Sequence, residues 1–484
     1  MPSLKGALTR QLYLWHRWLG IVAGLLVLLW FGSGIVMMYV PYPELTEEER
    51  MAWLAPLDAA RVQVRAGDAW RALALPGVPD GVRLNAVAGR PAWHFQHDGR
   101  WHSAWADSGK PLAVTGEVVN ASAGLAAPGA RWFTVDVIDL DQWTFGAVRV
   151  HRPLYRVSAD DAAGSVLYVS GRTGELVRDT TRAERAWNWV GSTVHWIYVT
   201  PLRKHGELWR QAVMWTSGVA CLLAVTGMVL GIQRLRVRRR YKGGRLSPYR
   251  GWQAWHHWLG LVIGTLTVTW LFSGWLSVGP FGFPSAPGPS AQDRLAFAGG
   301  ALGQEDLAAD PAPLLRARPG TLELEWRRVG GSLYLSALGR EGRMLFDAGN
   351  GARVAQLPLG ELRKPAQALR PGAAMRLDLL HEADDYYYGH HRAAAFPVLR
   401  ARFDLPLAPT FYIDPAQGRL VGYVDRDTRW NRWLFNGLHQ FDFAFLRTRP
   451  GWDVLVVALC LLGAMLSATG LVLGWRRLRT HPGS

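Results

Sequence analysis

Four long apolar stretches constrain this chain more than any other feature. They cover residues 14–39, 211–233, 257–278 and 454–475, and each is long enough for the roughly 20 helical residues that a bilayer crossing needs. The first stretch is too long for a secretory signal and is not followed by a small-residue cleavage site, so we expect it to remain as an anchor. The near-neutral mean hydropathy fits a chain that is part membrane bundle and part soluble domain. The sequence therefore predicts a mainly α membrane protein with a bundle of four transmembrane helices.

Basic residues gather beside these stretches. Of the net charge of +16, most comes from fourteen Lys and Arg residues in residues 1–17, 234–250 and 476–484, where no Asp or Glu accompanies them. Positive charge on one side of the spans is typical of cytoplasmic segments. Both termini and the middle loop are therefore expected in the cytoplasm, and the long segments 42–185 and 279–430 outside it. A nucleic-acid partner would instead need a basic stripe on a folded domain, so none is expected.

The chain also repeats itself. WHRWLG at residues 15–20 matches WHHWLG at 255–260, and TGMVLGIQRL at 226–235 matches TGLVLGWRRL at 469–478. VLYVSGRTGELV resembles TFYIDPAQGRLV, and each is predicted to form a strand, a turn and a second strand. We therefore expect two tandem units, each with a span, an external α+β domain, a helix that bears a histidine, and a returning span. Such repeats form parallel halves related about the membrane normal.

Four of the fourteen histidines follow this repeat. His16 and His256 lie at one depth near the cytoplasmic side, and His195 and His439 lie together near the outer face. Two such pairs on facing helices could hold two planar macrocycles, because imidazole is a strong neutral ligand of haem iron. A histidine between tryptophans can also be an interface anchor, although a buried polar ring without a partner is costly in lipid. His257 is the second choice to His256, which is the residue that aligns with His16.

Other small and titratable residues accompany these motifs. Gly20 and Gly24 follow His16 at four-residue spacing, and equivalent glycines follow His256. Such glycines let a flat ring approach the backbone, but they also form ordinary contacts between membrane helices, and the sequence leaves both alternatives open. The equivalent glycines are Gly260 and Gly264. Histidines of the first outer segment lack metal-ligand spacing and are expected on the surface: His94, His97, His102 and His151.

One tyrosine-rich stretch has no counterpart in the first unit. It reads HEADDYYYGHHR at residues 381–392. Packing of the tyrosine rings, with their hydroxyl groups hydrogen-bonded, is one interpretation. The other is the lip of a substrate site over the outer haem, where Tyr387, Tyr388 and His390 would contact a bound ferric complex.

Together these motifs resemble the PepSY-associated transmembrane family, which includes inner-membrane ferric-siderophore reductases. The resemblance is carried by WHRWLG and its repeat, DYYYGHH, YIDPAQGRLVGYVDRDTRWNRWLFNGLHQFDF and TGLVLGWRRL, and it covers nearly the whole chain. It implies a bacterial inner-membrane protein with two periplasmic PepSY-like domains and two haem b groups, held by His16, His195, His256 and His439. The implied partners are the lipid bilayer, a periplasmic ferric chelate or siderophore, and an electron donor that is either cytoplasmic or a quinol.

The expected division of the chain follows from the spans and the resemblance. It is 1–41 for the cytoplasmic N-terminus and first span, 42–184 for the first PepSY-like domain, 185–233 for a histidine-bearing helix and second span, 234–252 for the basic loop, 253–278 for the third span, 279–428 for the second PepSY-like domain, 429–476 for a histidine-bearing helix and fourth span, and 477–484 for the cytoplasmic tail.

The leading functional hypothesis is a haem b oxidoreductase that reduces a periplasmic ferric chelate by one-electron transfer. The two cysteines, Cys221 and Cys460, lie in separate spans, so no thiolate site is expected. No nucleotide or flavin fingerprint occurs, so the electrons need a separate donor. The alternative is a non-enzymatic PepSY protein that binds peptides or regulates peptidases, which predicts no cofactor. A transporter is a third possibility, but the spans lack the interior charged residues that usually mark an ion path.

Overall fold

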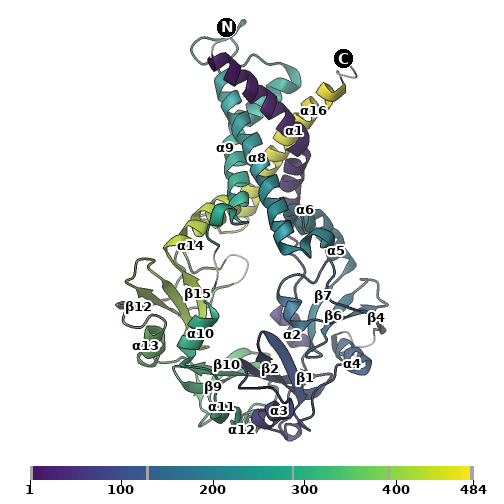
Figure 1. The fold of residues 1–484 in the computed structure, drawn as a ribbon, viewed down its shortest axis with the longest axis vertical. Coiled ribbons are helices and arrows are strands. Elements are labelled where there is room, and N and C mark those ends of the chain that lie inside the picture. Colours follow the sequence, from purple (N-terminus) through teal and green to yellow (C-terminus); the bar gives the residue numbers. More distant parts are fainter. Residues whose placement is uncertain (1–3, 127–129, 286–287, 390–392, 480–484) are drawn as a thin grey trace. The chain divides into compact units, whose positions relative to one another are not determined.

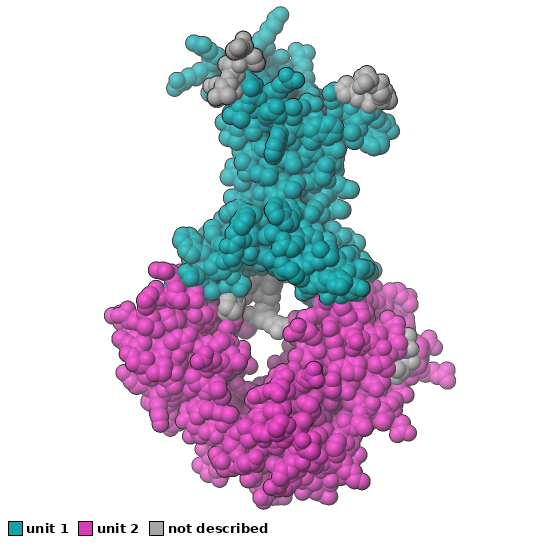
Figure 2. Space-filling model, viewed as in Figure 1, with its two compact units in different colours: residues 1–42, 186–286, 427–484 teal, residues 43–185, 287–426 magenta. Residues whose placement is uncertain are grey.

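The computed structural model describes residues 4–126, 130–285, 288–389 and 393–479. The chain divides into two compact units (Figures 1 and 2). Unit 1 joins residues 1–42, 186–286 and 427–484, and unit 2 joins residues 43–185 and 287–426.

Four long helices form the body of unit 1: α1 (Leu4–Met37), α8 (Gly206–Arg234), α9 (Gly251–Leu276) and α16 (Gly451–Arg479). All four are long and apolar enough to cross a membrane, which confirms the four predicted spans. Helix α1 packs against α8 and α16, and α9 packs against the same two helices, so α1 and α9 are diagonal partners in the bundle. The first turn of α1 and the last turn of α16 lie at the same end of the bundle (Figure 1).

The segments that lead into α8 and α16 are broken, whereas the sequence predicted one helix in each. Gly191 has non-helical dihedral angles. Ile197 and Phe441 are left-handed, both at φ 54°, and each follows a three-residue helix that carries His195 or His439. The elements before α8 are α5 (Arg182–Asn188), the π-helix η3 (Trp189–Thr193), α6 (Val194–Trp196) and α7 (Thr200–Arg203); those before α16 are α14 (Arg426–Asn431), the π-helix η5 (Arg432–Gly437) and α15 (Leu438–Gln440).

Unit 2 contains a seven-stranded antiparallel sheet that is shared by two distant parts of the chain. At the junction, Leu84 of one half lies opposite Leu324 of the other. One core cluster includes Trp70, Trp93 and Trp326 and joins this sheet to three short helices. The strands, in spatial order, are β11 (Arg353–Val354), β10 (Gly342–Asp347), β9 (Ser332–Gly339), β8 (Glu323–Val329), β1 (Gly81–Val87), β2 (Arg90–His97) and β3 (Arg100–Trp105); the helices are α3 (Ala66–Ala72), α11 (Gln304–Leu307) and α12 (Ala312–Ala317).

Each half of unit 2 also has a four-stranded antiparallel sheet with one helix packed on it. Ala123 of α4 packs with Val157 in the first half, and Leu362 of α13 packs with Phe411 in the second. The two predicted strand–turn–strand motifs are confirmed as β6–β7 and β14–β15. The elements are α4 (Gly116–Ala126), β4 (Trp132–Ile138), β5 (Leu154–Ala159), β6 (Val166–Ser170) and β7 (Leu176–Thr180), then α13 (Leu359–Ala368), β12 (Met375–Leu380), β13 (Val398–Phe403), β14 (Thr410–Asp414) and β15 (Arg419–Val424).

Local sequence signals fix the remaining short helices of the two halves. Thr46 and Glu49 form a reciprocal capping box that begins α2 (Glu47–Trp53), and Ser290 and Asp293 form the equivalent box at α10 (Ala291–Ala298). Each box satisfies backbone N–H groups that the first helical turn leaves without partners. Two 3₁₀ turns complete unit 2: η1 (Ala59–Arg61) and η2 (Ala147–His151); a third, η4 (Pro280–Gly282), belongs to unit 1.

Candidate functional site

The first histidine pair joins the two diagonal helices of the bundle. The ring centroids of His16 on α1 and His256 on α9 lie 6.2 Å apart, with an interplanar angle of 39°. His16 Nδ1 lies 3.1 Å from the carbonyl oxygen of Leu223 on α8. His256 Nδ1 lies 3.0 Å from Thr469 Oγ1 on α16. Each ring is therefore held through Nδ1 by the helix next to its own.

The second pair is formed by the two short helices that precede α8 and α16. The ring centroids of His195 and His439 also lie 6.2 Å apart, with an interplanar angle of 65°. His195 Nδ1 lies 3.1 Å from Ser33 Oγ on α1, and His439 Nδ1 lies 3.2 Å from Ser273 Oγ on α9. Burial lowers the pKa of both rings, that of His195 to about 4. Both rings are thus neutral at physiological pH, the form in which imidazole binds metals.

The hydrogen bonds around these rings determine which ring nitrogen carries the proton. Thr469 Oγ1 donates to the carbonyl of Leu466 at 2.7 Å, and both serine hydroxyls likewise donate to carbonyls three residues earlier. A hydroxyl whose hydrogen is already used accepts from the ring, and the carbonyl beside His16 can only accept. Every Nδ1 therefore carries the hydrogen and every Nε2 carries a lone pair. No hydrogen bond reaches the four Nε2 atoms from the part of the chain that the structure describes.

A glycine lies against each of the four rings. A β-carbon placed on Gly227 would lie 2.5 Å from Cε1 of His16, which leaves no room for any larger residue. The corresponding distances to Cε1 of the nearest histidine are 3.1 Å at Gly470, 3.1 Å at Gly274 and 3.7 Å at Gly34. Glycine permits this close approach of a ring to the helix backbone. Each glycine directly follows a hydroxyl residue in the sequence: Ser33-Gly34, Thr226-Gly227, Ser273-Gly274 and Thr469-Gly470.

The glycines beside the two WH motifs have a different role. The side chains nearest to them belong to leucine or methionine residues of neighbouring helices. These glycines therefore lie in contacts between helices, which was one of the two alternatives that the sequence left open. The signal that could have identified the glycines beside the rings was the hydroxyl–glycine dipeptide, which occurs in every span, although α8 also contains a second one, Ser217-Gly218. The glycines with helix contacts, and the residues they approach, are Gly20 and Leu223, Gly24 and Leu471, Gly260 and Leu466, and Gly264 and Met228.

His257 points to other neighbours than His256 does. Its Nε2 lies 2.9 Å from the carbonyl oxygen of Gly231, and its ring lies 5.3 Å from the ring of Tyr249. A carbonyl only accepts, so Nε2 of His257 carries the hydrogen and the lone pair is on Nδ1, which is buried without a hydrogen-bond partner. His256 faces His16, with ring centroids 6.2 Å apart, so the geometry favours His256 over its neighbour as a ligand.

The ring spacing matches that of two imidazoles on one metal. Metal–imidazole bonds of about 2 Å, with ring centres about 1 Å beyond each bonded nitrogen, place two collinear rings about 6 Å apart. Nδ1–H groups held by the protein are also typical of metal-ligating histidines. Among the described residues, no group of three or more His, Cys, Asp or Glu could hold a metal ion. Two-histidine sites suit a metal whose other ligands come from a cofactor rather than a metal bound by side chains alone.

The tyrosine-rich stretch belongs to unit 2, where its rings pack inward. Tyr387 stacks on Tyr412 with centroids 5.1 Å apart. Asp384 accepts hydrogen bonds from the backbone N–H of Tyr387 and from the hydroxyl of Tyr412 at 2.8 Å. These contacts agree with the first interpretation, in which the tyrosine rings pack and their hydroxyl groups are hydrogen-bonded. Tyr388 is half-buried, and His390 lies outside the described residues, so the substrate-lip interpretation stays a prediction.

The expected surface position is wrong for His94. This residue is completely buried, with Nδ1 2.8 Å from Ser103 Oγ and Nε2 2.9 Å from Asn85 Oδ1. Asn85 continues the chain of hydrogen bonds to Glu175 Oε1 at 2.7 Å. Because both ring nitrogens are satisfied, the neutral ring can be buried without an unpaired polar group. The other three histidines are half-buried: His97, His102 and His151.

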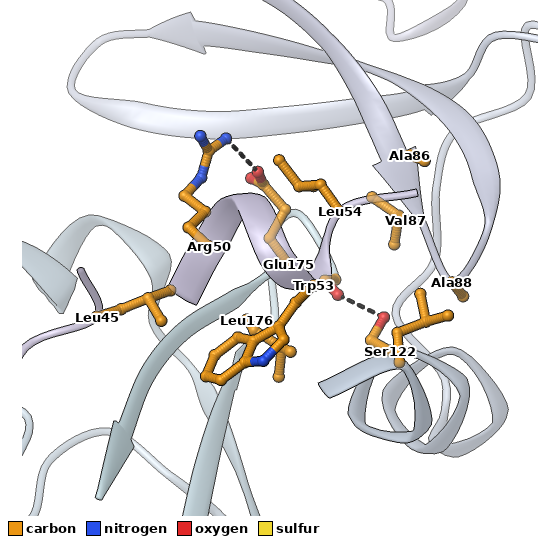
Figure 3. Close-up of a pocket in the computed structure, with 12 residues that line it drawn as sticks. Leu45, Arg50, Trp53, Leu54, Ala86, Val87, Ala88, Ser122, Glu175 and Leu176 are labelled. Atoms are coloured by element: carbon orange, nitrogen blue, oxygen red, sulfur yellow. Dashed lines mark hydrogen bonds and ion pairs between the residues drawn. The ribbon is translucent and has the colours of Figure 1, made fainter. Parts of the chain in front are cut away.

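A buried ion network ties the two halves of unit 2 together. Arg83 on β1 lies 2.7 Å from Glu175 and 2.9 Å from Glu323 on β8. Arg50 contacts Glu175 (Figure 3) and also Glu323. Although burial raises the pKa of Glu323, the charges of Arg83 and Arg50 lower it to about 2. The cavity beside the network has only about 30 Å³, room for water but not for a larger ligand. The network is therefore structural.

We expect His94 to make unit 2 less stable as the pH falls. Burial lowers the pKa of His94 from 6.5 to about 4, so between these values the unfolded chain binds a proton that the native ring does not. Stability is therefore lost as the pH falls below 6.5, by up to about 3 kcal/mol at pH 4. The urea midpoint of the β2 region, followed by pulse proteolysis of the whole protein between pH 7 and pH 5, should fall with pH less steeply in His94→Gln than in the wild type.

The exposed His381 provides the matched control for this measurement. His381→Gln should keep the wild-type slope, and an unchanged slope in His94→Gln would contradict the assignment. Only the difference between variants is used. The contributions of other titrating groups to the slope therefore cancel. One such group is Asp179, whose pKa is raised to about 7 by burial.

Fold and sites together define a class of membrane protein, one with a four-helix bundle, two histidine pairs and antiparallel α+β domains. A family model described as PepSY-associated TM region matches residues 13–477. The chain therefore belongs to the PepSY-associated transmembrane family, as its motifs predicted. Among curated proteins, none matches this chain.

Proposed function

We propose that the protein is a haem b oxidoreductase that passes electrons across the membrane to a ferric chelate. One haem would be held by His16 and His256, and a second by His195 and His439. The observation that carries the proposal is the presence of two pairs with the same ring spacing of 6.2 Å and with a free Nε2 on every ring. Haem iron takes only its axial ligands from side chains, so two histidines are a complete protein ligand set.

We also propose that the chain is a tandem repeat in the bacterial inner membrane. The three basic segments adjoin the start of α1, the α8–α9 connection and the end of α16, and the two terminal ones lie at the same end of the bundle (Figure 1). The positive-inside tendency makes this end cytoplasmic. Residues 43–185 and 287–426 connect the opposite ends of the spans and are then periplasmic. Matching hydroxyl–glycine dipeptides and matching left-handed residues after His195 and His439 support the repeat.

The heights of the two pairs suit a path across a bilayer. Gly34, which contacts His195, follows His16 by 18 residues on α1, and Gly274, which contacts His439, follows His256 by 18 residues on α9. At about 1.5 Å per residue this is about 27 Å along either helix. The hydrocarbon core is about 30 Å thick. The pairs would thus lie near opposite faces of the membrane.

In this proposal the chain binds the haem groups and adjusts their reduction potentials, and it needs no acid, base or nucleophile. Bound haem would supply reversible one-electron transfer. The protein keeps the imidazoles neutral, orients each ring through Nδ1–H and buries the site, three factors that affect ligand strength and reduction potential. The electrons would come from a cytoplasmic donor or a quinol and leave to a periplasmic ferric chelate or siderophore.

Haem content tests the proposal directly. Protein purified from haem-replete cells is expected to contain about two haem b groups per chain, with a reducible b-type spectrum. An external ferric chelate should reoxidise the reduced protein. Pyridine haemochrome assay and stopped-flow spectroscopy measure these outcomes. Colourless protein would contradict the proposal and favour the non-enzymatic alternative, in which PepSY domains bind peptides or regulate peptidases.

A further inference from the structure

Unit 2 contains a cavity whose walls are rich in arginine. Its volume is about 370 Å³, within the range of about 300–1,000 Å³ that is usual for small-molecule sites. Arg100 begins β3, Arg149 belongs to η2, Arg152 follows η2, and Arg172 lies in the turn between β6 and β7. The only acid that lines the cavity is Asp139. Four cations from three parts of the fold, β3, η2 with its C-cap, and the β6–β7 turn, therefore surround one space.

The protein itself does not neutralise this charge. Within the described part of the chain, none of the four guanidiniums forms an ion pair. Arg172 Nε donates to the carbonyl of Arg152 at 2.9 Å, which fixes two of the arginines relative to each other. Arg152 Nε is buried without a hydrogen-bond partner. Burial lowers the pKa of Arg152, and the charge of Arg149 lowers it further, against an opposing effect of Asp139.

A neighbouring histidine responds to the same positive potential. The pKa of His102 on β3 is lowered, first by burial and then by the charges of Arg172, His97 and Arg100. Arg152 and Arg172 are half-buried, and an unpaired charge in such a position is unfavourable unless a ligand compensates it. The cavity is thus an unsatisfied cation cluster with the volume of a ligand site.

We propose that this cavity binds a small polyanion with two or more carboxylates. Guanidinium groups suit such a ligand because they form paired hydrogen bonds with carboxylate oxygens. If the proposed function holds, on which this second step rests, the ligand is a ferric polycarboxylate chelate of net negative charge, such as ferric citrate. The same arginines would repel a positively charged ferric trihydroxamate.

Gallium citrate, which resembles ferric citrate but is not reduced, is the probe for binding to the whole protein. Calorimetry should show binding that weakens about tenfold or more in Arg100→Gln/Arg149→Gln, because charge-assisted hydrogen bonds are lost. Both residues are exposed, so the fold should tolerate the change. Arg316→Gln/Arg363→Gln removes the same charge from exposed positions of the same unit and should bind normally. Equal weakening in both double variants, or none in either, would overturn the inference.

Competition and turnover define the ligand class. Inorganic phosphate that displaces gallium citrate as effectively as citrate does would overturn the assignment to a multi-carboxylate ligand. In steady-state reduction of ferric citrate, Arg100→Gln/Arg149→Gln should raise KM and leave kcat unchanged. Reduction of a positively charged ferric trihydroxamate should not be slowed.

Failure of this inference is distinguishable from failure of the proposed function. Gallium citrate binding does not require haem, so a colourless protein that binds it through the arginines would retain the site and lose the proposed function. A protein with two haems and no arginine-dependent binding would retain the function and overturn the site.

Discussion

Replacing His256 with alanine should lower the haem content from about two to about one per chain, whereas replacing the adjacent His257 should leave it at about two. His256 lies 6.2 Å from His16, centroid to centroid, and has a free Nε2. His257 uses Nε2 to donate to Gly231. Because the two residues are neighbours on α9, each variant controls for the general effect of losing an imidazole from that turn. Pyridine haemochrome assay per mole of protein measures the result.

The outer pair provides an independent arm of this experiment. His439→Ala should also remove about one haem, and it should abolish reduction of an external ferric chelate, because electrons could no longer leave at the outer face. If His257→Ala lost a haem and His256→Ala kept both, His257 would be the ligand and the assignment of His256 would be wrong. Efficient chelate reduction with His195 and His439 both replaced would refute the outer site.

The features that sequence could predict are local or repeated along the chain. Length and hydropathy identify the spans, because any helix in lipid has to be long and apolar. Duplication of WHRWLG relates His16 to His256 at an offset of 240, and a repeat places equivalent residues at equivalent depths. The pairing of histidines therefore followed from periodicity without any knowledge of which helices are neighbours.

The features that sequence could not predict depend on which elements meet in space. Gly227 contacts His16 although 211 positions separate them, and only the packing of α1 against α8 brings the two together. The burial of His94 depends on partners from two other strand positions, Ser103 and Asn85. The sheet shared by β1 and β8 likewise joins segments whose sequences show no sign of pairing. Long-range packing decides all three features.

The second large effect is expected from the glycines that lie against the rings. Gly227→Val should remove the haem between His16 and His256, about one of two per chain, and leave the outer one. A β-carbon at Gly227 would lie 2.5 Å from His16 Cε1, so the ring would have to move and would lose its Nδ1 hydrogen bond to α8. Haem content and the low-spin b-type spectrum report the loss. Gly32→Val is the matched control, because a β-carbon there meets no atom within 4 Å.

A series of such substitutions makes the argument quantitative. The distance from a β-carbon placed on the glycine to Cε1 of the nearest histidine is 2.5 Å at Gly227, 3.1 Å at Gly470 and at Gly274, and 3.7 Å at Gly34. Alanine at each position should therefore reduce haem occupancy most at Gly227, less at Gly470 and Gly274, and least at Gly34, where the contact is an ordinary one. General disruption of the membrane helices would not follow this order, because it does not depend on distance to a histidine ring. Equal losses at all four positions, or full occupancy in Gly227→Ala, would show that the rings do not rest on these glycines when haem is bound.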